Sequence, residues 1–127
     1  MGHREDLLVQ LQADNHKERQ HAAQLLSQFD DVEAIKALSN AMNDGSVIVA
    51  RTATLSLGKI GGDGVTESLL AGLEHQSLWV QKAAVEALGK AGVQSVAPHL
   101  VITLADPNLH ALSREALIAL NLDPDFF

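Results

Sequence analysis

Histidine is the residue type in this sequence with the strongest capacity to bind a transition metal. There are six: His3, His16, His21, His75, His99 and His110. A metal site on a helix commonly places two histidines four residues apart, so that both side chains reach one ion. Here neighbouring histidines stand at least five residues apart, and none is followed directly by glutamate. We therefore expect surface histidines and no bound metal.

A second candidate for chemistry is the cluster Gly61-Gly62-Asp63-Gly64, which has the flexibility of a phosphate-binding loop. Such loops follow a strand and carry a complete glycine fingerprint or a Lys-Ser/Thr pair. Here a helical pattern precedes the cluster and no such pair follows it, so a tight turn between helices is favoured. The serines and histidines form no recognisable triad. The sequence predicts no catalytic residue and no cofactor, and hence a protein that is not an enzyme.

Composition argues against further classes of function. The chain has 16 acidic and 9 basic residues, a net charge of −7. Binding to nucleic acids or anionic membranes depends on lysine and arginine, so we expect neither partner. Without cysteine there are no disulfides or thiolate metal sites. No apolar run approaches the roughly 20 residues of a membrane span, and the amino terminus lacks a signal-peptide pattern. We expect a cytoplasmic protein.

The elements that position these residues follow from an internal repeat of 31 residues. Residues 49–61 align with residues 80–92 without a gap, and residues 18–30 occupy the same frame one unit earlier. Small and aliphatic residues recur four positions apart, and therefore share one helical face. These columns are Ala22/Ala53/Ala84 and Leu26/Leu57/Leu88. We predict that this face is buried.

The second half of each unit carries its own apolar stripe. Its columns are Ala34/Val65/Val96, Leu38/Leu69/Leu100 and Met42/Leu73/Leu104. The two stripes predict eight helices, near residues 4–13, 16–28, 32–43, 47–59, 64–74, 78–90, 94–105 and 110–121. Glycines are expected where the first helix of a unit ends, and polar N-caps where the next unit begins. The glycines are Gly58, Gly61, Gly62, Gly64, Gly89 and Gly92, and the N-caps are Ser46, Ser77 and Asn108.

These observations predict one domain over residues 1–127, with an all-α fold. We expect an α-α superhelix, a right-handed solenoid of antiparallel helical hairpins. Its repeats are predicted at residues 16–46, 47–77 and 78–108, with partial units at 1–15 and 109–127.

One stretch of the repeat resembles a known family. The pattern Val-x-x-x-Ala-x-x-x-Leu-Gly-x-Ile-Gly at residues 49–61, followed by a second helix ending near Leu73, is similar to the HEAT-like repeat named after phycobilisome (PBS) lyases. The resemblance covers nearly the whole chain. The arginine usual after the valine is present only as Arg19, with Ala50 and Gln81 in the next units. The resemblance implies stacked hairpins and, as one possible function, the handling of a bilin chromophore.

Exposed columns on the second helices carry the main binding hypothesis. Positions opposite the leucine stripe form a ridge centred on Lys36, Asn40, Glu67, Ala71 and Ile102. The ridge changes from polar at the amino end to apolar at the carboxyl end. In stacked hairpins the second helices line one surface, usually the concave one. We predict that this ridge binds another protein; a solvated face with one exposed isoleucine is the alternative.

The first helices carry a second candidate binding surface. Ile48 and Trp79 share a column, and Leu55 lies two turns beyond Ile48. Since all three are predicted to point away from the buried stripe, they could form an apolar contact patch. This predicts a homodimer through Ile48, Leu55 and Trp79, with Trp79 as a partner-binding residue. The alternative is that Trp79 folds over the preceding turn near Leu78 and His75.

The last predicted helix has no second helix to cover it. We expect Leu122, Phe126 and Phe127 to fold back as a lid, because a repeat stack exposes its core at an uncapped end. An end-to-end contact with another chain is the alternative. Taken together, the sequence favours a non-catalytic protein-protein interaction scaffold. A bilin lyase-related or chromophore-handling protein is the alternative.

Overall fold

The computed structural model describes residues 3–126 of the chain. Within this range there are eight α-helices and no β-strand. The helices are α1 (His3–Gln10), α2 (His16–Leu25), α3 (Val32–Ala41), α4 (Val47–Ile60), α5 (Thr66–Gly72), α6 (Leu78–Ala91), α7 (Ala97–Thr103) and α8 (His110–Ala119). Short 3-10 turns at Leu26–Gln28, Asp63–Val65, Gln94–Val96 and Pro124–Phe126 lie between or after them. The predicted all-α fold is confirmed.

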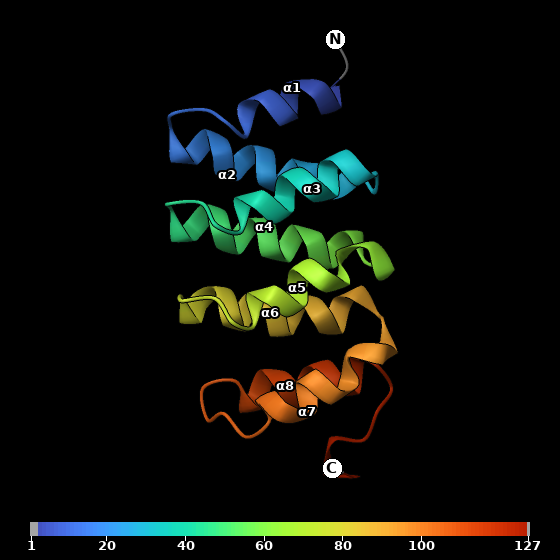
Figure 1. Ribbon diagram of the computed structural model, residues 1–127. Helices are drawn as coiled ribbons and strands as arrows, with labels where there is room; N and C mark the ends of the chain where they lie inside the picture. Colours follow the sequence, from blue (N-terminus) through green and yellow to red (C-terminus); the bar gives the residue numbers. More distant parts are fainter. Residues whose placement is uncertain (1–2, 127) are drawn as a thin grey trace.

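The helices form a two-layered stack (Figure 1). The first helices α2, α4, α6 and α8 pack on one another in sequence order and form one layer. The second helices α1, α3, α5 and α7 form the other layer, and each packs on the first helix that follows it. The two ends of the chain lie at opposite ends of the stack. Each unit therefore buries its apolar faces mainly against its neighbours.

The core lies between the two layers and consists of the two predicted stripes. All six residues of the first-helix columns are at most 1% exposed. In the second helices, the Leu38/Leu69/Leu100 column is completely buried. Because most core residues are alanine, valine and leucine, the layers lie close together and the interior is thin.

Two glycines were wrongly predicted to end helices. Gly58 and Gly89 are buried inside α4 and α6, which continue to residues 60 and 91. A Cβ atom at Gly58 would lie 2.6 Å from Cβ of Ala87, and one at Gly89 would lie 2.8 Å from Cα of Ala116. These glycines allow successive first helices to approach each other closely, which is their structural role.

The predicted turn at Gly61 and Gly62 is present. Both residues have positive φ, 71° and 78°, a region that glycine occupies at little cost. The backbone N–H of Gly62 donates to the carbonyl of Ala91, 3.1 Å away, at the end of α6. The cluster thus ends α4 and also satisfies a carbonyl of the next unit, instead of forming a phosphate loop.

The turns before the first helices are closed by the side chains of one column of the repeat. Asp44 accepts from the N–H of Ser46 (2.8 Å), Nδ1 of His75 from the N–H of Ser77 (2.9 Å), and Asp106 from the N–H of Asn108 (2.9 Å). Ser46 and Ser77 occupy N-cap positions without a side-chain cap bond. The N-cap of α8 is Leu109, so Asn108 was wrongly predicted.

The carboxyl-terminal lid forms only in part. Asn121 has φ 64° and follows α8, and the N–H of Leu122 donates to the carbonyl of Leu117 (2.9 Å). Leu122 packs against the core and Pro124 is buried, but Phe126 is 82% exposed. The segment after α8 therefore contributes Leu122 and Pro124, and not Phe126, to the buried end of the stack. Phe127 lies outside the described residues.

Candidate functional site

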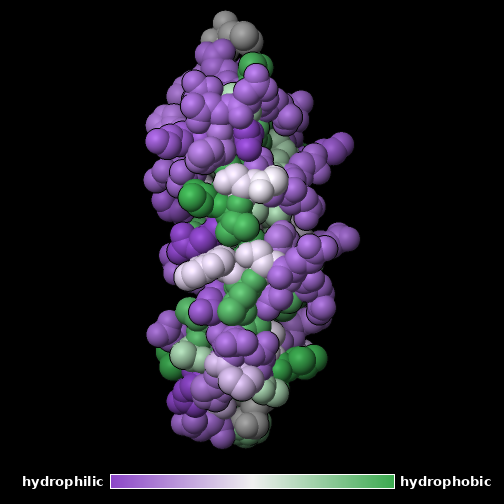
Figure 2. Space-filling model, turned by 90° about the vertical axis from the view of Figure 1, so that its left-hand side faces the viewer, coloured by the Kyte–Doolittle hydropathy of each residue, from purple (hydrophilic) through white to green (hydrophobic). Residues whose placement is uncertain are grey.

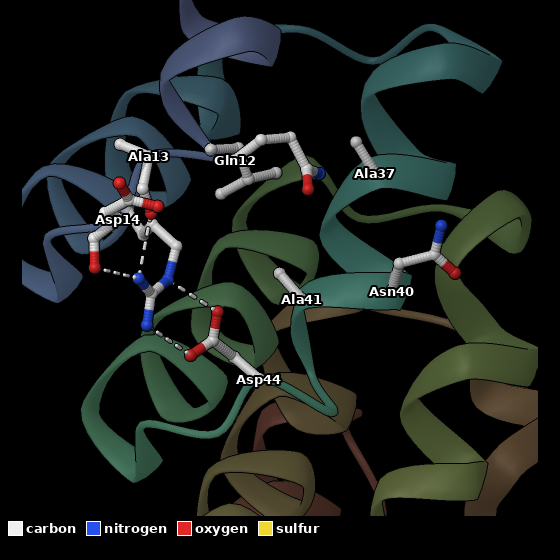
Figure 3. A pocket seen from close by; sticks show the side chains of 9 residues that line it. Gln12, Ala13, Asp14, Ala37, Asn40, Ala41 and Asp44 are labelled. Carbon is white, nitrogen blue, oxygen red and sulfur yellow. Dashed lines mark hydrogen bonds and ion pairs between the residues drawn. The ribbon is translucent and has the colours of Figure 1, made fainter.

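Three grooves follow one another along the face of the second helices. The first groove lies between the end of α1 and the helix α3, has a volume of about 420 Å³, and is shown in Figure 3. The second lies between α3 and α5, and the third between α5 and α7, with volumes of about 140 and 240 Å³. Each is open to solvent at the surface of the stack.

The grooves are equivalent positions of successive units. Six columns at the 31-residue period line all three: Leu11/Met42/Leu73, Gln12/Asn43/Glu74, Ala37/Ser68/His99, Asn40/Ala71/Ile102, Ala41/Gly72/Thr103 and Asp44/His75/Asp106. Every groove therefore has the same backbone framework and a different set of side chains. A partner lying along the stack would meet this framework three times.

The structure brings three of the predicted ridge residues to these grooves. Asn40, Ala71 and Ile102 are exposed, and each lines one groove. Lys36 and Glu67 are also exposed, one helical turn earlier, and line none of the three. All five ridge residues are thus exposed on the second helices. The role of the ridge in binding stays a prediction.

Sequence reasoning missed the turn residues of the grooves. Asp44, His75 and Asp106 were not among the predicted site residues, although they recur at the same period as the ridge. Their side chains close the turns and line the grooves at the same time. Their common 31-residue period could have revealed them. A turn residue that follows an exposed helix column at the same period must border the same surface.

Arg19 stabilises the first groove. Its Nε and Nη2 donate to the carboxylate of Asp44, at 2.9 and 3.1 Å. Nη1 donates to the carbonyls of Ala13 and Asp14, both at 2.9 Å, as the dashed lines in Figure 3 show. Burial raises the pKa of Asp44, but the Arg19 guanidinium and the Ser46 N–H outweigh it and keep that pKa below its ordinary value. All three nitrogens of the Arg19 guanidinium are therefore hydrogen-bonded within the protein.

The second groove is bordered by paired polar groups. Nε2 of His75 lies 3.0 Å from the carbonyl of Met42, and the hydroxyls of Ser39 and Ser68 are 2.6 Å apart. These contacts join successive units across the groove. Ala71 contributes only a methyl group to this groove.

The third groove combines apolar and acidic side chains. Ile102 is 72% exposed, and Leu73 is half-buried beside it. Glu74 and Asp106 line the same groove, together with His99. The groove therefore suits an apolar side chain that is accompanied by a positive charge.

The amino-terminal end of this face is occupied by an ion-pair network. Arg4 of α1 donates to both carboxylate oxygens of Asp31, with the shortest contact at 2.7 Å, and also pairs with Glu5 and Glu33. The hydrogen bond from Arg4 is the main reason why the pKa of Asp31 is lowered. Since Asp31 is also the N-cap of α3, Arg4 joins two second helices.

The first-helix layer presents a different surface. Ile48 and Trp79 are 52% and 62% exposed, and the ring of Trp79 lies 5.5 Å from Nζ of Lys82. Trp79 is therefore largely exposed and lies beside Lys82 of its own helix. Leu55 is half-buried and lines a separate groove between α2, α4 and α6. Figure 2 shows the edge where α4 and α6 begin, with apolar groups gathered along the middle of a largely hydrophilic surface. Homodimerisation through this patch stays a prediction.

No metal centre is assembled in the part of the chain that the structure describes. Glu18 and His21 have the Glu-x-x-His spacing on α2, but no third potential ligand approaches them. Of the helices between residues 3 and 126, none combines the length and the hydropathy required to cross a lipid bilayer.

Comparisons with known proteins agree with this architecture. A family profile described as HEAT repeats matches residues 5–77. A chain of the complex of CpcE and CpcF of phycocyanin lyase from a Nostoc species superposes with a TM-score of 0.80 at 24% identity, over 94% of this chain and 54% of that one. Human deoxyhypusine hydroxylase gives a TM-score of 0.81 at 22% identity, over 93% and 43% of the two chains.

An engineered protein superposes with a TM-score of 0.67 at 20% identity, over 99% of this chain and 65% of that one. The comparison with curated proteins finds no match. The chain spans about half the length of the two natural proteins, 54% and 43%. At these identities the likeness shows the helical repeat fold.

Proposed function

Because the chain belongs to the HEAT repeat family, we propose that it is a non-catalytic scaffold that holds a segment of another protein along its three second-helix grooves. The observation that carries the proposal is the register of the grooves. Six columns line each of them, so a single partner segment can place side chains in equivalent positions of three units.

The chemistry of the grooves supports a partner with a defined direction. The first groove is polar and is bordered by Asn40 and the Arg19–Asp44 pair. The third offers Ile102 beside two carboxylates. An exposed apolar residue that lines a groove is the kind of position where binding energy concentrates. The partner segment therefore has an apolar residue next to a basic one where it meets α7.

The proposal is tested by measuring how strongly variants of the ridge bind the partner protein. A partner is first identified by pull-down and mass spectrometry, and its dissociation constant is then measured by calorimetry. Replacing Ala71 and Ile102 together with lysine is expected to weaken binding at least tenfold, about 1.4 kcal/mol. Both side chains are exposed in the free protein, so the variant should keep its helical circular dichroism.

The matched control is Ile118→Lys. Ile118 is 56% exposed on α8, in the other layer, and its replacement introduces the same change in side chain. Partner binding should be unaffected. Equal binding by the Ala71/Ile102 variant and the wild type would show that the three second-helix grooves are not the binding site. Loss of binding only in the Ile118→Lys control would show the same.

A second candidate function rests on the likeness to the phycocyanin lyase chain, with a TM-score of 0.80. Under this alternative the chain attaches, removes or carries a bilin on another protein. Incubation with free bilin followed by gel filtration and absorbance separates the two candidates. A scaffold elutes colourless, whereas a chromophore-handling protein elutes with a visible absorbance band.

A further inference from the structure

The two layers of the stack carry charges of opposite sign. The four first helices contain seven of the nine lysines and arginines but only three of the sixteen aspartates and glutamates. The remaining acidic residues lie on the second helices, in the turns and in the carboxyl-terminal segment. Arg19 and Arg114 are paired with Asp44 and Asp125, and the other five basic residues make the first-helix layer locally basic in a protein whose net charge is −7.

On this basic face, α4 and α6 present the same pattern in register. Each begins with an exposed apolar residue, Ile48 or Trp79, and continues with basic residues one and three turns later. The basic residues are Arg51 and Lys59 on α4, and Lys82 and Lys90 on α6. All of them stand at offsets of three and eleven residues from the apolar one, so they share its helical face.

The basic residues border a groove of about 370 Å³. Arg51, Lys59 and Lys90 line it together with Leu55 and a single carboxylate, Glu86. Among the described residues, Arg51 and Lys59 form no ion pair, and Lys90 has only a contact of 3.7 Å with Glu86. In contrast to Arg19, these charges are not used to hold the fold together. They remain available to a ligand.

We propose that this face of α4 and α6 is a second docking surface, which takes an acidic segment of a partner protein carrying an aromatic or aliphatic anchor. Charge complementarity selects the acidic partner, because carboxylates meet Arg51, Lys59 and Lys90. The anchor packs against Ile48 and Trp79, whose exposed apolar surface lies at one end of the same two helices. The protein is then a two-sided adaptor, with a different partner on each layer.

The experiment selects peptides from a random library on the wild-type protein and measures their affinities by fluorescence polarisation. Selected peptides are expected to be rich in aspartate and glutamate around one large apolar residue. Lys59→Glu/Lys90→Glu should weaken their binding about tenfold or more, since it replaces attraction by repulsion. Trp79→Ala should also weaken it, and added NaCl should weaken it progressively.

The matched control is Lys36→Glu, a charge reversal at an exposed lysine of the second-helix face, which should leave these affinities unchanged. Peptides without acidic enrichment, or peptides sensitive to Ile102→Lys instead of Lys59→Glu/Lys90→Glu, would overturn the proposal. So would sedimentation showing a wild-type dimer that Trp79→Ala dissociates, because a second copy would then occupy the surface. Far-UV circular dichroism and thermal melting of each variant establish that it is folded.

Discussion

At the scale of single residues, the helical glycines were the hardest to interpret from the sequence. A glycine near the end of an apolar pattern can end a helix or admit a neighbouring backbone, and the pattern is the same in both cases. Gly61 and Gly92 have positive φ and end helices, whereas Gly58 and Gly89 admit Ala87 and Ala116. Only the packing of the next unit distinguishes them.

Replacing Gly58 by alanine is expected to destabilise the protein. The added methyl group would meet Cβ and Cα of Ala87 at 2.6 and 2.7 Å. Such overpacking costs about 1–3 kcal/mol, more than the ~1 kcal/mol that alanine gains over glycine within a helix. Urea unfolding should show a lower free energy of unfolding. Gly45→Ala, where nothing lies within 4 Å, is the control, and a stabilised Gly58→Ala variant would contradict the close approach.

The ion pairs of Asp31 and Asp44 predict that stability falls in acid. The pKa of each carboxyl is lowered in the folded state from its ordinary value of 3.8. The unfolded chain therefore takes up protons first, and the stabilisation present above about pH 4 is lost as the pH falls through the folded-state values. Urea midpoints measured from neutral to acidic pH should decrease in that window.

The Asp44→Asn variant tests the assignment of this effect. It should begin less stable at neutral pH and show a weaker decrease in acid, because the titrating group is gone. Asp63→Asn, at an exposed position without an ion pair among the described residues, should follow the wild type. An unchanged acid profile in Asp44→Asn would mean that other groups control the loss of stability.

At the scale of elements, the repeat predicted where the first helices begin more accurately than how the second helices begin. The predicted first residues of α2, α4, α6 and α8 agree with the structure. Two second helices begin later than predicted, at Thr66 and Ala97, because 3-10 turns occupy residues 63–65 and 94–96. Apolar periodicity continues through a 3-10 turn, so the sequence alone did not separate the two.

The end of α8 offers a prediction at this scale. Asn121 adopts φ 64°, and its N–H donates to the carbonyl of Ile118 (2.9 Å), while the N–H of Leu122 reaches Leu117. This arrangement favours glycine or asparagine at residue 121. Asn121→Ala should lower the free energy of unfolding by about 1 kcal/mol, and Asn121→Gly should retain or increase it. Thermal melts of both variants measure the difference; equal melting temperatures would argue against a left-handed helix end.

At the scale of the whole molecule, the repeat predicted which surface is exposed but not how it is shaped. The ridge columns were read from the sequence, and Asn40, Ala71 and Ile102 lie where they were expected. The grooves between them depend on how closely neighbouring units pack, and that distance is set by contacts such as Gly72 against Ala84 and Met42. The sequence repeat alone does not specify the distance between neighbouring units.

Stacking also predicts a gradient of local stability. Helices α4 and α6 each contain seven buried residues and have a unit on both sides, whereas α1 has a single buried residue, Leu7. Since units are stabilised by their neighbours, amide hydrogen exchange should be slowest in α4 and α6 and faster in α1 and after α8. Uniform protection along the stack would instead indicate one fully cooperative unit.

The separation of charge between the two layers has a consequence for encounters in solution. The net positive charge of the first helices, opposite the net negative charge of the second helices, contributes an electric dipole directed across the stack. A charged partner exerts a torque on such a dipole before the surfaces touch, which turns the matching side toward it and speeds productive collisions at low ionic strength. Two partners of opposite sign would then approach from opposite directions without competing for access.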